Sequence, residues 1–255
     1  MHPADWLFAG IDPSSTSAEV IFCILDAQLK IVALDEGSID ASMDALAGRA
    51  GAAVAINSPA GVNRGVVRRR AVRAMTAPHQ VRGAEVRLAE YELRASGIVV
   101  SATPGRADLC VPWVQRGFRV HARFLEAGFR PAPDAAGSHI VMETNPEACF
   151  HALLGTRPLP KPTVEGRIQR QLVLHERGVR VRDPMLFFEE VTRHRLLSGS
   201  LPTDTVHSGA LLDALVAAYT AWLAATAPDS ITWLGESAEG QIAFPGARPL
   251  PAGLA

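Results

Sequence analysis

Residues 6–56 decide the fold, because they contain four apolar runs that read WLFAGI (6–11), EVIFCIL (19–25), KIVAL (30–34) and AAVAI (52–56). Each run is too short for a helix, and the second is rich in the β-branched and aromatic residues of buried strands. Between the third and fourth runs, Ser38 or Asp40 can cap a helix that extends to about Ala50. The order strand, strand, strand, helix, strand predicts an antiparallel meander and then a crossover to a parallel strand.

The rest of the chain continues this α/β pattern. A further buried strand is predicted at 140–143 and a closing hairpin at 230–234 and 241–244. Helices are predicted at 109–127, 147–154, 165–176, 184–197 and 208–225, each near a Pro or Gly that starts or stops it. No internal repeat or linker divides the sequence, so residues 1–255 are predicted to form one domain, with residues 63–130 as an insertion within it.

Composition places the chain among ordinary globular proteins. It has 255 residues, 48% hydrophobic and 20% charged, with 26 acidic against 25 basic residues, which excludes disordered, collagen-like and coiled-coil proteins. Cys23, Cys110 and Cys149 form no CxxC pair, so neither a disulfide framework nor a zinc ribbon is expected. No run reaches the roughly 18 apolar residues of a membrane span, and Asp5 stands where a signal peptide would be basic. A cytoplasmic protein without membrane contact is predicted.

The basic residues are almost all arginines, with Lys30 and Lys161 as the two lysines. Residues 64–94 contain eight arginines against three glutamates, an excess of five positive charges. Guanidinium groups suit phosphate, so this segment can form a surface for a polyanion. A solvated helical face is an equally good interpretation of the same residues.

Two acids stand at positions that need an explanation. Asp12 comes directly after the first strand, where ligands bind in open α/β sheets, although an Asx turn over 12–15 also accounts for it. Asp213 lies in the apolar helix ALLDALVAAY (210–219), where an unpaired carboxylate is costly and no cation is within one helical turn. A metal ion, a catalytic proton or an arginine from elsewhere in the chain can explain Asp213.

Two more oxygen-bearing side chains follow buried strands. Glu143 ends the run IVME (140–143), and Asn57 follows AAVAI. Carboxylate and amide oxygens are the ligands that Mg²⁺ prefers. We therefore expect the carboxylates of Asp12, Glu143 and Asp213 to face one cavity, with Asn57 beside them. The eight histidines show no HExxH spacing, so a histidine-based metal site is not predicted.

These residues occur within a series of short blocks that resembles a known family. In order, the blocks are GID (10–12), AINSPAG (55–61), EYELR (90–94) with GI (97–98), ETNPE (143–147), KPT (161–163) with GR (166–167) and Arg170, LDAL (212–215) with AA (217–218), and EGQI (239–242). They resemble the successive blocks of the domain-of-unknown-function family four-two-nine. Members of that family are described as predicted nucleases with a ribonuclease H-like fold.

The resemblance implies a ribonuclease H-like mixed sheet, three antiparallel strands plus parallel ones, flanked by helices. It also implies a metal-dependent nuclease in which Asp12, Glu143 and Asp213 hold Mg²⁺ or Mn²⁺ and Asn57 occupies a fourth catalytic position. The basic residues predicted to contact nucleic acid are Arg68, Arg69, Arg70, Arg73, Lys161 and Arg167. The sequence departs from the family at Asn57, where Asp is usual, and the neutral side chain weakens the expected metal site.

Two alternatives stay open. The chain can be a catalytically lapsed ribonuclease H-like module that binds nucleic acid or a protein partner. GIDPSSTS (10–17) also looks like the first phosphate loop of actin-like ATPases and sugar kinases, but Ser14 stands where that loop has Gly, and no internal repeat supplies a second half. The oligomeric state is not predicted.

Overall fold

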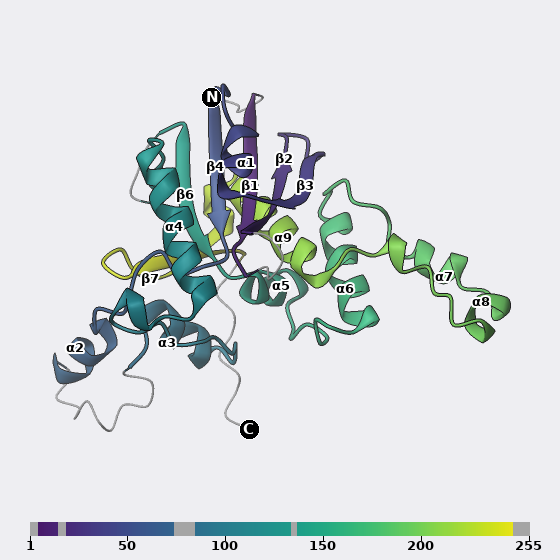
Figure 1. Cartoon of the computed structure of the whole chain (residues 1–255). Helices are drawn as coiled ribbons and strands as arrows, with labels where there is room; N and C mark the ends of the chain where they lie inside the picture. The colour runs from purple at the N-terminus through teal and green to yellow at the C-terminus, as the bar shows by residue number, and fades with distance from the viewer. Residues whose placement is uncertain (1–4, 15–18, 74–84, 134–136, 247–255) are drawn as a thin grey trace.

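The computed structural model describes residues 5–14, 19–73, 85–133 and 137–246. The described residues form one eight-stranded mixed sheet with helices on both faces (Figure 1). The strand order is β3-β2-β1-β4-β6-β8-β7, and β5 also pairs with β6. The strands are β1 (Trp6–Asp12), β2 (Val20–Leu25), β3 (Ile31–Gly37), β4 (Gly51–Ile56), β5 (Arg130–Pro131), β6 (His139–Thr144), β7 (Ile231–Glu236) and β8 (Gly240–Pro245).

The predicted meander and crossover are confirmed. β1 pairs antiparallel with β2, β2 pairs antiparallel with β3, and β4 joins β1 in parallel. The crossover contains α1 (Ile39–Asp44), whose N-cap Ser38 accepts a hydrogen bond from the Ala41 N–H. This helix is shorter than predicted and ends at Asp44. The mixed α/β architecture is consistent with the ribonuclease H-like fold class expected from the sequence.

Helices cover the sheet in two layers (Figure 1). The larger hydrophobic core contains residues of α9 and α5 together with the strand residues Phe8, Ala55 and Met142. A second core contains residues of α4 together with the strand residues Ile11, Ile56 and Val141. We call these two sides the α9 face and the α4 face of the sheet. The helices are α2 (Val66–Arg73), α3 (Leu88–Ala95), α4 (Pro112–Glu126), α5 (Pro146–Leu154), α6 (Val164–Glu176), α7 (Leu186–Glu190), α8 (Arg193–Leu197) and α9 (Gly209–Thr226).

The single helix predicted for residues 184–197 is wrong, because the structure has two short helices there, α7 and α8. Val191 and Thr192 between them have extended backbones. Thr192 caps α8 by accepting a hydrogen bond from the Arg195 N–H. A β-branched residue followed by a capping threonine therefore breaks the helix, although both halves keep helical spacing. The two short helices project away from the sheet (Figure 1).

Within the predicted insertion, α4 forms part of the layer that covers the sheet. Its residues Val120 and Phe124 are buried in the core of the α4 face. Residues 74–84 of this segment lie outside the described residues, so the boundaries 63–130 stay a prediction. The three cysteines are all free and buried, as expected for a chain without a disulfide framework.

The segment Thr203–Thr226, which contains α9, is long and apolar enough to cross a membrane by length and composition. In this fold most of it is buried against the sheet, as the core helix of a soluble protein would be. The structure is therefore compatible with a soluble protein, and the cytoplasmic location stays a prediction.

Candidate functional site

Asp12 is the last residue of β1 and is fully buried. Its Oδ1 atom accepts a hydrogen bond of 2.9 Å from the Ser14 N–H, so the expected turn forms around it. Residues 15–17 of the predicted turn and phosphate loop lie outside the described residues. The Oδ2 atom of Asp12 is buried without a hydrogen-bond partner in the described part of the chain. A buried carboxylate with one unpartnered oxygen is costly, and a cation would relieve that cost.

Asp213 reaches the same place from α9. This helix packs directly on β1 because Gly10 has no side chain: a Cβ there would lie 2.0 Å from the Ala214 carbonyl oxygen and 2.3 Å from the Ala218 nitrogen. The small residues Ala214, Ala217 and Ala218 of α9 make this close helix-to-strand contact. Since Asp12 lies two residues beyond Gly10 on the same strand face, the contact brings Asp213 beside it.

The two carboxylates influence each other electrostatically. Burial is the largest influence on Asp213 and raises the pKa of its carboxyl to about 7, against the lowering effect of the Lys161 ammonium. The negative charge of Asp12 also raises this pKa. The Nζ atom of Lys161 donates a hydrogen bond to Asp213 Oδ2, which makes Lys161 the cation paired with the buried helical acid. One explanation of Asp213 offered by the sequence was an arginine from elsewhere in the chain. The partner does come from elsewhere, 52 residues away, but it is a lysine.

Glu143 points to the other face of the sheet. The register pairs Ile11 with Ile56 and Ile56 with Glu143. Neighbouring residues at one register level point to the same face, and Ile11 and Ile56 belong to the core of the α4 face. Asp12 is one position further along β1 and therefore points to the α9 face.

Arg87, which comes just before α3, forms a bidentate ion pair with the carboxylate of Glu143. Its Nη1 and Nη2 atoms donate to the two Glu143 oxygens at 2.8 and 2.5 Å, and its Nε donates to Glu90 at 2.8 Å. All three side chains are at most 3% exposed. Burial lowers the pKa of Arg87, but the charges of Glu143 and Glu90 outweigh it and raise the pKa above its ordinary value. Because both oxygens of Glu143 accept hydrogen bonds from Arg87, its negative charge is compensated within the protein.

The expectation that Asp12, Glu143 and Asp213 face one cavity is therefore corrected. Asp12 and Asp213 meet on the α9 face, and Glu143 lies with Arg87 on the α4 face. Among the described residues, no three His, Cys, Asp or Glu side chains are grouped closely enough to hold a metal ion. The alternation of side chains along β6 is the reason, since a one-residue offset in register reverses the face.

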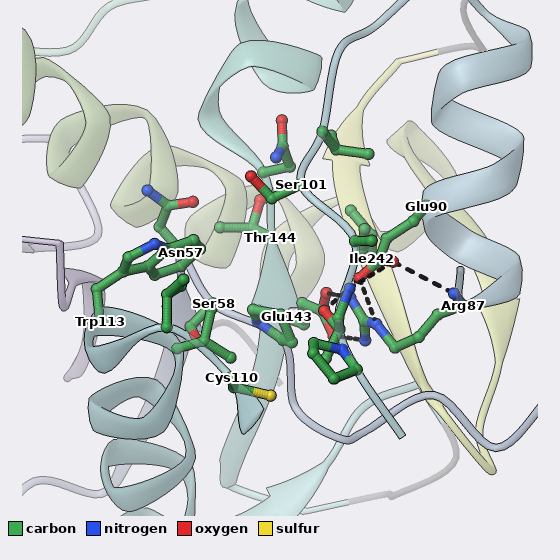
Figure 2. Close-up of a pocket in the computed structure, with 18 of the residues that line it drawn as sticks. Asn57, Ser58, Arg87, Glu90, Ser101, Cys110, Trp113, Glu143, Thr144 and Ile242 are labelled. Carbon is green, nitrogen blue, oxygen red and sulfur yellow. Dashed lines mark hydrogen bonds and ion pairs between the residues drawn. The ribbon is translucent and has the colours of Figure 1, made fainter. Parts of the chain in front are cut away.

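Asn57 lies between the Asp12–Asp213 pair and the Glu143–Arg87 pair. It follows β4, and its N–H donates a 2.8 Å hydrogen bond to the Ile11 carbonyl, which places it next to Asp12. Together with Glu143 it lines a cavity of about 360 Å³ over the ends of β4 and β6 (Figure 2). None of the described residues forms a side-chain hydrogen bond with the Asn57 amide, so this amide is available to a ligand.

The predicted nucleic-acid contacts form two groups. Arg68, Arg69, Arg70 and Arg73 are exposed on α2, with Arg70 paired to Glu236. Lys161 and Arg167 line an open pocket at the start of α9, together with Ser208 and Gly209. Figure 1 shows α2 and α6 on opposite sides of the edge where β1, β4 and β6 end. Arg82 lies outside the described residues.

Sequence reasoning missed Arg87 and Glu239. The buried carboxylate of Glu239 accepts hydrogen bonds from the backbone N–H groups of Arg64, Val66 and Leu88, so it anchors the segment before α2 and α3 to the β7–β8 turn. For Arg87, its position three residues before Glu90 was a visible signal of a local pair. Its partner Glu143 is 56 residues away, and only the fold brings the two together.

Comparison with known proteins gives one match. The profile of the family described as "Protein of unknown function (DUF429)" matches residues 10–239, which covers most of the chain and includes Asp12, Asn57, Glu143 and Asp213. No curated protein and no solved structure matches the chain.

Proposed function

The chain belongs to the DUF429 family, and on that premise we propose that it is a metal-dependent phosphodiesterase acting on nucleic acid, with its centre at Asp12 and Asp213. The observation that carries the proposal is the pair of buried carboxylates at the end of β1. One Asp12 oxygen has no partner in the described residues, and burial raises the pKa of Asp213 to about 7. Such under-compensated acids are typical of functional sites.

The donor set fits a hard divalent cation. Mg²⁺ is usually held by one or two carboxylates, with waters and substrate phosphates completing its coordination, so a third acid is not required. Asp12 and Asp213 would hold Mg²⁺ or Mn²⁺, and the amide oxygen of Asn57 is the neutral candidate beside them. When bound, the cation supplies Lewis-acid activation of a phosphate and of water. Glu143 acts in this proposal through Arg87 and through the Ala60 N–H, both of which it binds.

The basic residues beside Asp213 suit the phosphate of the substrate. Lys161 pairs with Asp213 but keeps 40% of its side chain exposed, so it can turn from the carboxylate to an incoming phosphate. Arg167 lines the same pocket, and its Nε atom is buried without a partner in the described part of the chain. The exposed arginines of α2, Arg68, Arg69, Arg70 and Arg73, are a second proposed contact for the nucleic-acid backbone.

Metal titration tests the proposal. We expect millimolar Mg²⁺ or Mn²⁺ to raise the melting temperature of the protein and to support hydrolysis of DNA or RNA, because a cation that binds only the folded state stabilises it. The variant Asp12→Asn should lose both effects. Asp44→Asn, which changes an exposed carboxylate on α1, is the matched control and should retain both. A melting temperature that does not respond to either metal would refute the metal site.

One observation favours the lapsed, binding-only alternative: Arg87 and Lys161 already provide positive charge to Glu143 and Asp213. Under that alternative, the protein binds nucleic acid with EDTA present and hydrolyses none of it. Binding that is unchanged by metal, together with no hydrolysis of single-stranded DNA, duplex DNA or RNA, would replace the nuclease proposal by this one.

A further inference from the structure

The cavity over the ends of β4 and β6 has two chemically different sides. Figure 2 shows Asn57, Ser58 and Trp113 on one side and Arg87, Glu90 and Ile242 on the other. Its volume of about 360 Å³ is in the range of small-molecule sites, roughly 300–1,000 Å³. The acid pair Asp12 and Asp213 does not line it, so the cavity is a neighbouring compartment and not the proposed metal centre.

The charged side of the cavity repels a phosphate. Arg87 brings one positive charge, and Glu90 and Glu143 bring two negative charges. Glu90 is further satisfied by the N–H of Thr103 at 3.1 Å and by its hydroxyl group. His121 near this network adds no charge at neutral pH, since burial lowers its pKa. An anionic group is therefore disfavoured on this side of the cavity, whereas a neutral group carries no such penalty.

The other side of the cavity has unused hydrogen-bonding groups. Ser58 is 2% exposed, and its Oγ atom has no partner in the described residues. Gly117 of α4 leaves room for this hydroxyl, because a Cβ at that position would lie 1.7 Å from it. Asn145 caps α5 through its Oδ1 atom, which accepts from the Ala148 N–H and leaves the amide NH₂ as a donor. The Ser58 hydroxyl lies against Gly117, so it reaches a polar ligand edge in the cavity by rotating about χ1, and that contact would supply its missing partner.

The entrance of the cavity is apolar and partly aromatic. Trp113 follows Pro112 in the first turn of α4 and is half-buried. Val99, Leu109 and Val111 line the same cavity and are 86%, 63% and 51% exposed. Large apolar side chains exposed together around a cavity are typical of a ligand site. A flat aromatic ring over hydrogen-bonding groups is suited to a planar heterocycle.

We propose that this cavity holds one unpaired nucleobase of the substrate, stacked on Trp113 and hydrogen-bonded by Ser58 and Asn145. The inference rests on the proposed function and narrows its substrate to single-stranded nucleic acid and mononucleotides. Asn57 borders the cavity and also contacts β1 beside Asp12. β4 and β1 are adjacent strands about 4.8 Å apart, so the distance from the cavity to Asp12 is short enough for the phosphate of a bound nucleotide to span. A paired base cannot enter without leaving its duplex.

Binding measurements in EDTA test the cavity without using catalysis. The probes are a fluorescently labelled single-stranded oligonucleotide of about 12 nucleotides, the corresponding duplex, and an abasic strand of equal length and charge. We expect the base-containing single strand to bind more tightly than the other two. Trp113→Ala should weaken its binding about tenfold and leave the abasic strand unaffected, whereas Trp113→Phe should retain most of the affinity. Trp233→Phe is the control, because Trp233 lines a different pocket with Ala132 and Ile140.

A second variant, Ser58→Ala, tests the cavity independently in case the Trp113→Ala protein does not fold. Ser58→Ala removes a buried hydroxyl that has no partner in the described residues, so the melting temperature should not fall, while single-strand binding weakens several-fold. Equal binding of the abasic and base-containing strands, or affinities that neither variant changes, would overturn the inference. The metal-dependent melting temperature separates the two proposals: a metal response without base-dependent binding rejects the cavity alone, and base-dependent binding without a metal response rejects the nuclease alone.

Discussion

Two pairs of buried acids stand at the same edge of the sheet, and they are treated in opposite ways. On the α4 face, Glu143 and Glu90 share Arg87, which donates to both oxygens of Glu143. On the α9 face, Asp12 keeps one oxygen unpartnered among the described residues, and Asp213 pairs with the half-exposed Lys161. The first pair is a completed ion network, whereas the second is incomplete.

The difference separates structural acids from functional ones. A buried carboxylate that is bidentate to arginine has little left to offer a ligand, and its removal mainly damages the fold. A buried carboxylate with an unused oxygen costs stability in the free protein, so it is better explained by what it binds.

Removing Arg87 should have the greatest effect on stability. Arg87→Ala leaves Glu143 and Glu90 buried without a cation, and breaking such a network costs about 3–5 kcal/mol of unfolding free energy. Urea denaturation monitored by tryptophan fluorescence measures this loss. The control is Arg70→Ala, which breaks a half-exposed pair with Glu236 and should cost less than about 1 kcal/mol. Equal losses in the two variants would mean that the α4-face network is not structural.

The approach of α9 to β1 should be nearly as sensitive. Gly10→Ala places a Cβ 2.0 Å from the Ala214 carbonyl oxygen, so the helix must move away, at a cost of about 3 kcal/mol. The displacement also separates Asp213 from Asp12, and the metal-dependent rise in melting temperature should shrink with it. Gly137→Ala is the control, because a Cβ there meets nothing within 4 Å. An unchanged metal response in Gly10→Ala would show that close helix packing does not assemble the acid pair.

Much of the fold, and the importance of Asp213, could be predicted from the sequence. Short apolar runs and capping residues were enough for the meander, the crossover and the buried position of α9. The isolated acid in ALLDALVAAY also pointed to Asp213. These signals are local, since strand length, helix spacing and caps depend on neighbouring residues.

The partners of the acids could not be predicted in the same way. Which face Glu143 takes depends on the register between β4 and β6, and a one-residue change reverses it. Lys161 reaches Asp213 and Arg87 reaches Glu143 across 52 and 56 residues. Such long-range pairs follow from the arrangement of whole elements, so composition and spacing alone grouped the three acids wrongly.

Asp213 should give the stability of the folded protein a pH dependence. Its folded pKa, about 7, is above its ordinary value, so the folded protein binds a proton more tightly than the unfolded chain. Stability from this group is therefore greatest near pH 4 and falls as pH rises to about 7. In metal-free buffer, Asp213→Asn should be about 2 kcal/mol more stable at pH 8 and unchanged near pH 4. Urea denaturation of both proteins at pH 4 and pH 8 measures this difference in stability. If the variant is instead less stable at pH 8, the ion pair between Lys161 and Asp213 stabilises the fold.

Asn57 offers the smallest and most informative change, because it stands beside the incomplete pair and is half-buried. Asn57→Asp adds an anion near Asp12 and Asp213, so without metal it should lower stability by about 1 kcal/mol through repulsion. With Mg²⁺ the sign should reverse, since a charged ligand replaces a neutral one and tighter binding stabilises the folded state. Melting temperatures across a metal titration measure both effects.

The control for this change is Gln28→Glu, which adds the same charge in the exposed turn after β2, at the opposite edge of the sheet. It should show no response to metal beyond that of the natural protein. Nuclease assays on the natural and Asn57→Asp proteins then separate two states of the same site. Hydrolysis by both means that a neutral amide is sufficient beside two carboxylates. Hydrolysis by the variant alone means that the natural protein keeps the fold and the acid pair but lacks the charge needed for catalysis.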